Sequence, residues 1–402
     1  MTKRVLMGRV LTGVWWLLVG VAFFLSLWIV VPPFTLGLLK LTVGAPEISP
    51  LLLGGNAIAL IVFLVRRQRG RFLGIFLSFL GVLLSTLPLL QLPAAIWQAE
   101  QSFEAAIASE TFVLPPADAA MTLESPPFSP ARFVGGMPTQ EVRYKPDIVF
   151  AEPDGIPLKL SIYQPLGAGV YPTIISLYGG GWQNGSPADL DRSSRYLASL
   201  GYVVAAIDYR HAPDYQFPTQ VTDVEAALSF LSARASAYGI DKQRLVLMGW
   251  SAGAHLAMLT AYQTTTPIRG VVGYYGPVNL VDGYKNLPSP DPLDVRAVLR
   301  TFMGGTPDEL PVAYNAASPV YAVKPGLPPT LLVYGRRDHI VKVEFGLRMY
   351  EALQKAENTA VFVEIPWAEH AFDAIFRGVS NQLAMKYTER FLRAATVVAE
   401  GE

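Results

Sequence analysis

The stretch LVLMGWSAGAHLAMLTAY, residues 245–262, places an apolar run, a glycine-flanked serine and a helix-like run directly after one another. Its centre, GWSAG at 249–253, matches the G-x-S-x-G pattern of a nucleophile elbow, a sharp turn between a strand and a helix that exposes a serine. So tight a turn admits only small residues two positions before and after the serine, and Gly249 and Gly253 meet that demand. The pattern predicts a nucleophilic Ser251. A plain glycine-rich turn would give the same five letters, so the surroundings must decide.

From residue 140 onward the chain alternates strand-like and helix-like runs. The predicted strands are 142–151, 158–163, 173–178, 203–208, 245–250, 271–275, 330–334 and 361–365. The later ones are continuously apolar, as in a parallel sheet covered on both faces. The predicted helices are 191–200, 220–238, 254–263, 343–356 and 379–395. This alternation predicts a doubly wound α/β domain, and the irregular stretch 277–319 is expected to form a partial lid over a pocket.

A serine nucleophile needs a general base. The chain has four histidines, and three are poorly placed: His211 lies upstream of the serine, His255 falls one helical turn past it, and His339 directly follows an aspartate. His370, in PWAEHAF, comes immediately after the last predicted strand, where the base of a Ser…Asp…His hydrolase belongs. We therefore expect His370 to be the base, against the alternative of a surface or core histidine.

The base in turn needs a carboxylate that orients it. Asp338 ends the run TLLVYGRRD just past the seventh predicted strand, and the order Ser251, Asp338, His370 is that of α/β-hydrolases. Glu369 and Asp373 are too near the histidine along the chain to be first choices. Asp338 is therefore the expected acid, although a turn or helix-cap aspartate is the simpler reading of the same residue.

Stabilisation of an oxyanion requires backbone N–H groups near the serine. YGGGW at 178–182 follows the third predicted strand, and its glycines allow the backbone to approach a tetrahedral intermediate closely. The N–H groups of Gly180 and Gly181, with that of Ala252 after the serine, are the expected donors.

Five segments carry a family resemblance: YGGGW at 178–182, DYRHAPDYQFPT at 208–219, GWSAGAHLA at 249–257, GRRD at 335–338 and EH at 369–370. Together, over residues 140–395, they resemble the α/β-hydrolase esterases of the hormone-sensitive-lipase type. The resemblance implies an eight-stranded, mostly parallel sheet with helices on both faces, and hydrolysis of carboxylic esters with short to medium acyl chains. It also implies that no cofactor and no metal is needed. The family's functional residues fall on the triad and oxyanion donors named above.

Two positions depart from this family. Tyr178 stands where the oxyanion motif usually begins with histidine, and Trp250 replaces an acidic residue at the variable position of the elbow. The first change bears on loop geometry and substrate choice more than on the triad. In the DYR segment, Asp208 and Arg210 are expected to form a structural ion pair.

The first hundred residues differ sharply from the rest, because apolar runs of membrane-spanning length occur at 10–31, 48–65 and 72–97. We expect these three to be transmembrane helices. The shorter apolar piece 34–43, which carries Lys40, is expected to be a loop or re-entrant segment.

Basic residues set the expected orientation. Lys3, Arg4 and Arg9 precede the first span, and Arg66, Arg67, Arg69 and Arg71 fall between the second and third. Positive charge marks the cytoplasmic side, so three spans place the catalytic domain on the extracytoplasmic side. A fourth span within 34–43 would reverse this.

The expected organisation is a transmembrane region over 1–98, a linker with a membrane-proximal helix over 99–139 and the catalytic domain over 140–398. The absence of cysteine excludes disulfides and a cysteine nucleophile, and a net charge of zero without a basic stripe argues against nucleic-acid binding. The expected partners are an ester substrate and the lipid bilayer. An amidase or lipid deacylase using the same triad, and a non-catalytic tethered binding module, are the alternatives.

Overall fold

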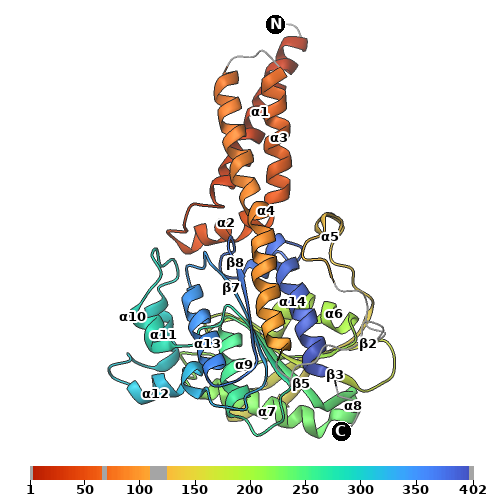
Figure 1. Cartoon of the computed structure of the whole chain (residues 1–402), viewed down its shortest axis with the longest axis vertical. Coiled ribbons are helices and arrows are strands. Elements are labelled where there is room, and N and C mark those ends of the chain that lie inside the picture. Colours follow the sequence, from red (N-terminus) through yellow and green to blue (C-terminus); the bar gives the residue numbers. More distant parts are fainter. Residues whose placement is uncertain (1–2, 66–69, 109–124, 398–402) are drawn as a thin grey trace.

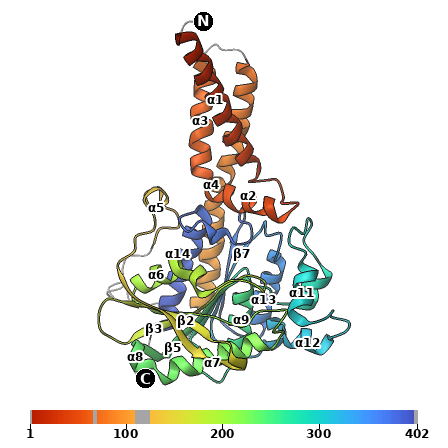
Figure 2. The same ribbon diagram turned by 180° about the vertical axis from the view of Figure 1, so that it is seen from behind.

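The computed structural model describes residues 3–65, 70–108 and 125–397, with side chains from residue 12 onward. It consists of an α/β domain and a narrow stalk of N-terminal helices that rises from it (Figures 1 and 2). The stalk contains the apolar runs of the sequence, and the α/β domain contains all the predicted strands.

Eight strands form one sheet in the order β1-β2-β4-β3-β5-β6-β7-β8. They are β1 (Val142–Ala151), β2 (Leu158–Pro165), β3 (Tyr171–Leu177), β4 (Val203–Ile207), β5 (Ile240–Trp250), β6 (Gly270–Tyr274), β7 (Thr330–Gly335) and β8 (Ala360–Ile365). β2 is antiparallel to both of its neighbours, and the remaining pairs are parallel. Val246, Leu247 and Met248 are all fully buried although successive strand residues point to opposite faces, so both faces of the sheet are covered. The predicted mostly parallel sheet is confirmed.

The helices of this domain fall between the strands. They are α5 (Pro130–Gly135), α6 (Asp191–Ser199), α7 (Thr219–Ala233), α8 (Ala235–Tyr238), α9 (Ala252–Gln263), α13 (Val343–Lys355) and α14 (Val379–Thr396), with short 3-10 turns η1 (Pro153–Gly155), η2 (Pro187–Leu190) and η4 (Phe372–Ala374). The predicted helix over 220–238 is broken at Arg234 into α7 and α8. Val224, Leu228 and Leu231 form the buried stripe of α7, as their spacing predicts.

The irregular stretch 277–319 contains short helices. They are α10 (Leu280–Lys285), α11 (Val295–Met303) and α12 (Pro311–Ala316), followed by η3 (Pro319–Ala322). Side-chain caps begin two of them: Asn279 accepts the N–H of Asp282, and Asp294 accepts that of Ala297.

Three stalk helices, α1 (Lys3–Leu27), α3 (Ser49–Val65) and α4 (Arg71–Ile107), pack against one another, and α2 (Leu36–Glu47) lies across their base (Figure 1). Of the two alternatives predicted for 34–43, the loop is wrong, because α2 is a helix, whereas a re-entrant segment is compatible with the sharp bend between α2 and α3. The Thr35 hydroxyl accepts the N–H of Leu38 and caps a helix whose Leu39 and Ala45 are buried. α2 meets α3 at an angle of 77°.

Within the described ranges, α4 is the one helix long and apolar enough by itself to cross a bilayer. α2 and α3 meet that criterion only as a bent pair, and the described apolar part of α1, Thr12–Leu27, is shorter than a span. The side chains of Lys3, Arg4, Arg9, Arg66, Arg67 and Arg69, on which the predicted orientation depends, lie outside the described part of the chain.

α4 does not end at the predicted limit of the last span, because its C-terminal turns belong to the core of the α/β domain. Ala95, Ala99, Phe103 and Ala106 are buried in that core. Gln98 bonds both the carbonyl of Phe362 and the N–H of Glu364, and the Ser102 hydroxyl accepts the N–H of Phe362. α4 thus covers the free edge of β8 and satisfies its backbone groups with side chains.

Candidate active site

Ser251 occupies a strained turn between β5 and α9. Its φ of 51° and ψ of −119° lie in a region that non-glycine residues rarely adopt, and its N–H donates to the carbonyl of Tyr274 at 2.9 Å. A Cβ at Gly249 would overlap the backbone of Gly253, and a Cβ at Gly253 would overlap the carbonyl oxygen of Leu177. The small residues of the motif are therefore required by backbone contacts on both sides of the serine.

The structure brings Ser251, His370 and Asp338 together. His370 Nε2 lies 3.0 Å from Ser251 Oγ, and His370 Nδ1 lies 2.7 Å from Asp338 Oδ2. The other oxygen, Asp338 Oδ1, accepts the N–H groups of Ile340 and Val341, each at 2.7 Å. Burial by itself would lower the pKa of His370, but the charge of Asp338 and its hydrogen bond outweigh that effect and raise the pKa. Three residues distant in sequence thus form one hydrogen-bonded chain.

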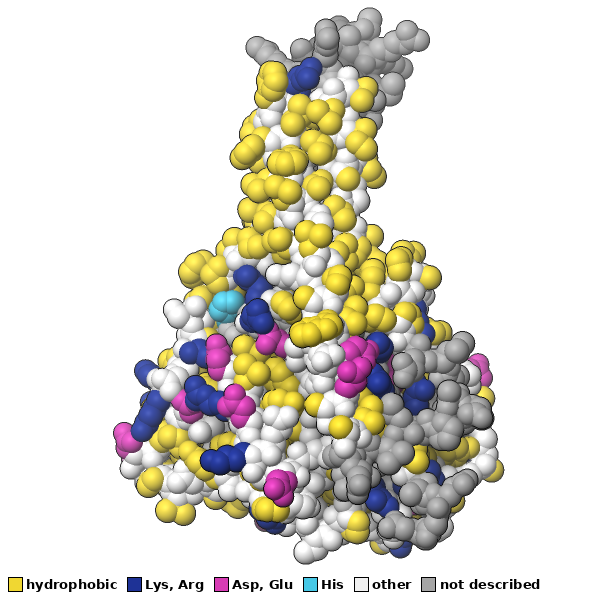
Figure 3. Space-filling view, viewed as in Figure 1, with side chains coloured by type: hydrophobic (Ala, Val, Ile, Leu, Met, Phe, Trp, Pro, Cys, Tyr) yellow, Lys and Arg dark blue, Asp and Glu magenta, His cyan; other side chains and the backbone are white. Residues whose placement is uncertain are grey.

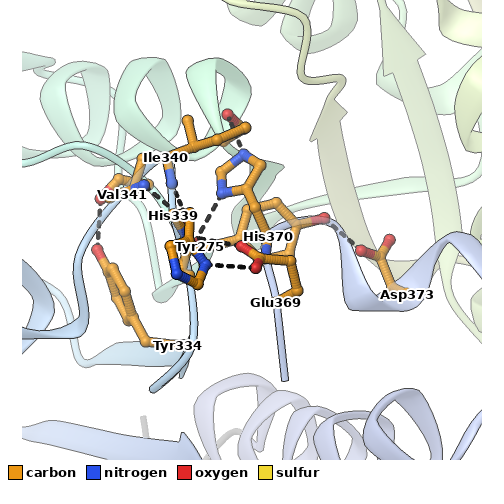
Figure 4. Close-up of polar contacts among 11 residues, drawn as sticks. Tyr275, Tyr334, His339, Ile340, Val341, Glu369, His370 and Asp373 are labelled. Carbon is orange, nitrogen blue, oxygen red and sulfur yellow. Dashed lines mark hydrogen bonds and ion pairs between the residues drawn. The ribbon is translucent and has the colours of Figure 1, made fainter. Parts of the chain in front are cut away.

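A second histidine–carboxylate pair, not expected from the sequence, holds the loops of Asp338 and His370 together (Figure 4). Glu369 accepts the backbone N–H of His339 at 2.6 Å, and its other oxygen contacts His339 Nδ1 at 2.6 Å. The same carboxylate accepts the N–H of His370 at 3.0 Å. Glu369 therefore links the two loops through hydrogen bonds. No local pattern reveals this role, since its partner lies 30 positions away.

Tyr275 and Asp373 also contact the site without having been predicted. The Tyr275 ring packs on the imidazole of His370 with centroids 4.5 Å apart, and its hydroxyl donates to Asp373 (Figure 4). Burial raises the pKa of Asp373. Tyr275 directly follows β6, and a side chain at the C-terminal end of a central strand is the one sequence signal that could have identified it.

The glycine loop after β3 lies against the elbow. A Cβ at Gly179 would lie 3.2 Å from Ser251 Cβ, and a Cβ at Gly180 would overlap the carbonyl of Asn184. Gly180 and Gly181 have φ values of 125° and 60°, which glycine adopts without strain. Neither donates its N–H to another residue in the described ranges, and Ala252 is the first residue of α9, where the N–H has no intrahelical acceptor. The three predicted donors therefore have N–H groups available beside Ser251.

Tyr178 holds the glycine loop in place through its contacts with residues 208–211. Its ring stacks on Tyr209 at 4.4 Å, its hydroxyl donates to Asp208 at 2.5 Å, and the same hydroxyl lies 2.8 Å from His211 Nε2. Tyr209 in turn donates its hydroxyl to the carbonyl of Tyr178. Burial raises the pKa of Tyr178, so the hydroxyl remains a donor. Tyrosine at this position therefore ties the loop to the DYR segment.

The expected ion pair between Asp208 and Arg210 is wrong. Arg210 instead pairs with Asp223 of α7 at 2.7 Å and with Asp154 at 2.8 Å. Asp223 also accepts the backbone N–H of Arg210, so both the side chain and the backbone of Arg210 are held by α7. The carboxylate of Asp208 is engaged by Tyr178, and proximity in sequence did not decide either partner.

His255 supports Trp182, the last residue of the YGGGW motif. Trp182 Nε1 donates to His255 Nδ1 at 3.2 Å, and His255 Nε2 lies 2.6 Å from the carbonyl of Ala317, which makes Nε2 the protonated nitrogen. The Trp182 ring also stacks on Phe302 of α11 at 4.1 Å. Complete burial lowers the pKa of His255 to about 4.

This histidine predicts a loss of stability in acid. An unfolded chain protonates histidine near pH 6.5, whereas the folded chain keeps His255 neutral down to about pH 4. Between these values the unfolded state binds more protons, so stability is unaffected above pH 6.5 and falls by up to about 3 kcal/mol as the pH drops towards 4. Melting temperatures of wild type and His255→Gln in detergent, at pH 7.5 and 5.0, measure the effect. The variant should lose less stability than wild type, and equal losses would contradict the assignment.

A cavity of about 730 Å³ opens beside Ser251. Its walls come from the glycine loop, the elbow, α10, α11 and the loops carrying Asp338 and His370. The apolar lining includes Leu280, Leu293, Val298, Leu299, Val341 and Phe345. α10 and α11 thus form one wall, in the position predicted for a partial lid. In the described part of the chain, no three His, Asp or Glu side chains converge as a metal site would require.

Comparison with known proteins finds similarity to proteins that are named as esterases. Residues 160–353 match the BD-FAE family. Esterase LipC of Mycobacterium tuberculosis is 32% identical over 220 residues, which cover 51% of this chain and 54% of that protein. Isoprenylcysteine alpha-carbonyl methylesterase ICME of Arabidopsis thaliana is 29% identical over 225 residues, covering 51% of this chain and 52% of that protein. The chain spans about half the length of the curated relatives it matches.

Among solved structures, the esterase Est2 of Thermogutta terrifontis superposes with a TM-score of 0.52 at 28% identity, covering 66% of this chain and 96% of that one. The fold is that of the α/β-hydrolases. LipC and Est2 are named as esterases and ICME as a methylesterase, which supports the esterase part of the resemblance inferred from the sequence. The hormone-sensitive-lipase type is not named by these matches.

Proposed function

We propose that this chain is a membrane-anchored serine hydrolase that cleaves carboxylic esters through an acyl-enzyme. The observation that carries the proposal is the hydrogen-bonded chain from Ser251 through His370 to Asp338, at the wall of a largely apolar cavity. Similarity to known esterases supports an ester as the bond that is cleaved.

In the proposed reaction, Ser251 Oγ attacks the acyl carbon while His370 Nε2 takes the hydroxyl proton. Asp338 accepts Nδ1–H, which keeps the Nε2 lone pair directed at the serine and stabilises the imidazolium that forms. The imidazolium then gives its proton to the leaving alcohol. A water molecule, deprotonated by the same nitrogen, attacks the acyl-enzyme and releases the carboxylic acid.

The negative charge on the acyl oxygen is stabilised by the N–H groups of Gly180, Gly181 and Ala252. Their support is geometric: the loop packs directly on the elbow and is held there by Tyr178 and Trp182. Ala252 also lies at the N-terminus of α9, whose dipole favours an anion at this point.

Membrane anchoring is supported by the surface of the stalk. Its outward side chains are apolar and largely without cover, as the space-filling view shows (Figure 3). More than half of the surface is exposed in each of Leu17, Leu51, Ile58, Ile61, Phe72, Phe76 and Leu90. So large a continuous apolar surface is far beyond what a soluble monomer exposes, and a bilayer would cover it.

The interior of the stalk supports the same conclusion, because small and polar residues lie between the helices. Ser26 Oγ and Ser85 Oγ are 2.9 Å apart, and Asn56 donates to Ser26 at 3.0 Å. Gly74 and Gly81 of α4 are in close contact with α3, since a Cβ at either would overlap Phe63 or Asn56. Apolar outside and small or polar inside is the pattern of helices packed in lipid.

We place α1, α3 and α4 as three spans with the α/β domain on the extracytoplasmic side. The 17 residues of α3 extend about 25 Å, close to the thickness of the hydrocarbon core. α4 begins at the end of the stalk remote from the α/β domain (Figure 1), and its first residue is Arg71. Basic residues at that end favour the cytoplasm.

A fluorophosphonate probe tests the proposed function. Membranes containing wild-type protein should be labelled on Ser251, as peptide mass mapping would show, and Ser251→Ala should be unlabelled. Leu293→Ala, a change in the cavity lining away from the elbow and the glycine loop, is the matched control and should retain labelling. Equal labelling of wild type and Ser251→Ala, or none of either, would contradict a serine hydrolase.

A further inference from the structure

The relation of α4 to β8 shows which edge of the sheet faces the stalk. Ser102 of α4 bonds Phe362, and Gln98, one turn earlier, bonds Glu364. Helix and strand therefore run in opposite directions, so the C-terminal end of β8 points towards the apolar, N-terminal part of α4. Because β3 to β8 are parallel, the whole C-terminal edge of the sheet, which carries the site, faces the stalk.

The loop carrying Asp338 is attached to the base of the stalk. Arg337 Nη2 donates to the carbonyl of Val30, just after α1, at 2.6 Å. Ile340, only three residues further along, lines the cavity. Three residues span at most about 11 Å, so this wall of the cavity lies within that distance of the backbone of Arg337, whose side chain bonds the base of the stalk.

The loop carrying His370 is attached to the stalk as well. Glu47, the last residue of α2, is fully buried and accepts the N–H, at 2.9 Å, and the hydroxyl of Ser380, in the first turn of α14, the helix that follows this loop. α2 also packs against η4, whose Asp373 and Ala374 line the cavity. Two walls of the cavity are therefore supported directly by the helices that we place in and on the membrane.

The level of the membrane surface follows from α2. Phe34 and Leu36, between α1 and the first turn of α2, are 65% and 52% exposed, and Lys40 is exposed on the same short helix. Exposed apolar residues beside a lysine are typical of a helix lying in the interface of a bilayer. The headgroup region then falls beside the loops that carry the triad.

The side chains that line the cavity limit the charge of a substrate that can bind there. Among the described residues that line it, Asp189 and Asp373 are acidic and none is lysine or arginine. An anionic group would therefore find no lysine or arginine partner there, whereas an acyl chain finds apolar walls.

We propose that the substrate is an uncharged ester whose acyl chain is dissolved in the leaflet next to the α/β domain, and that it enters the cavity from the bilayer at the level of α2. This inference rests on the proposed ester hydrolase function and adds the substrate class and its route. Water-soluble esters reach Ser251 without using that route.

The test uses full-length protein reconstituted into phosphatidylcholine vesicles, with 1-palmitoylglycerol as the bilayer-dissolved ester and p-nitrophenyl acetate as the soluble one. Phe34→Asp places a charge at the proposed entry level, outside the cavity lining. We expect its rate on palmitoylglycerol to fall by about tenfold or more, because a charge opposes insertion of this segment into lipid. Its rate on the acetate should stay within about twofold, which also reports a folded active site. Val312→Asp, at an exposed apolar position on α12, is the matched control and should change neither rate.

A second arm compares 1-palmitoylglycerol with 1-palmitoylglycerol 3-phosphate, which has the same chain and an anionic headgroup. We expect the uncharged ester to be hydrolysed about tenfold faster or more, because the described lining offers an anionic headgroup no lysine or arginine partner to offset its loss of hydration. Three results would overturn the inference while leaving ester hydrolysis intact: acetate cleaved but palmitoylglycerol not, Phe34→Asp equal to wild type on both esters, or equal rates on the two headgroups. Failure of wild type on every ester, without probe labelling, would instead overturn the proposed function.

Discussion

Replacing Asp338 with asparagine is expected to lower kcat for ester hydrolysis by about 10⁴-fold, or about 5 kcal/mol of transition-state stabilisation, while the protein remains folded. The amide oxygen of asparagine can still accept the N–H groups of Ile340 and Val341, so the loop keeps its shape. The amide nitrogen would face His370 Nδ1, however, and would donate to it. The imidazole would then carry its proton on Nε2 and could not accept one from Ser251.

Initial rates on p-nitrophenyl acetate, with the melting temperature in detergent as the check on folding, measure this effect. Asp373→Asn is the matched control, because Asp373 accepts a hydrogen bond from Tyr275 and not from the imidazole. We expect it to retain activity within about tenfold, which is 1.4 kcal/mol. An Asp338→Asn enzyme within tenfold of wild type would remove Asp338 from the proposed triad.

The second large effect is on folding. Gly253→Ala should destabilise the protein by more than about 3 kcal/mol, because the new methyl group would overlap the carbonyl oxygens of Leu177 and Tyr178. These atoms belong to the backbone at the end of β3 and the start of the oxyanion loop, so no side-chain rotation relieves the contact. Separation of the elbow from that loop would also abolish activity.

Yield and melting temperature of Gly253→Ala, compared with Gly273→Ala, test this expectation. Glycine 273 lies in the neighbouring strand β6, and a Cβ there would lie 3.5 Å from Met258 Cε, an ordinary contact. The control should therefore change stability by less than about 1 kcal/mol. Comparable melting temperatures for the two variants would show that the close approach of loop and elbow is not required for folding.

Local physics explains what could be predicted. The elbow depends on steric limits within five residues, and the strands depend on runs of apolar and β-branched side chains, so both are recorded in short stretches of sequence. The order of Ser251, Asp338 and His370 along the chain is tied to strand ends, which is why the sequence could propose residues that the fold places within hydrogen-bonding distance. Their catalytic roles stay a prediction.

Contacts between distant segments explain what could not be predicted from the sequence. Arg210 was assigned to its neighbour Asp208, but α7 brings Asp223 to it. Glu369 is too close to His370 in sequence to be expected in another role, yet in the fold it binds the loop of Asp338. The segment 34–43 has too short an apolar run to indicate a membrane helix, and its helical state depends on the Thr35 cap and on packing at the base of the stalk.

The apolar runs of the sequence indicated a membrane region, and the alternation of strand-like and helix-like runs indicated an α/β domain, because both patterns are properties of single segments. Only the tertiary structure showed that α4 continues from one into the other, that it covers the edge of β8, and that it turns the C-terminal edge of the sheet towards the stalk. The relative orientation of two parts arises from side chains that meet across some 260 positions, and no local pattern records such pairs. The elbow could be found from its sequence, whereas its position beside the proposed membrane surface is a property of the fold.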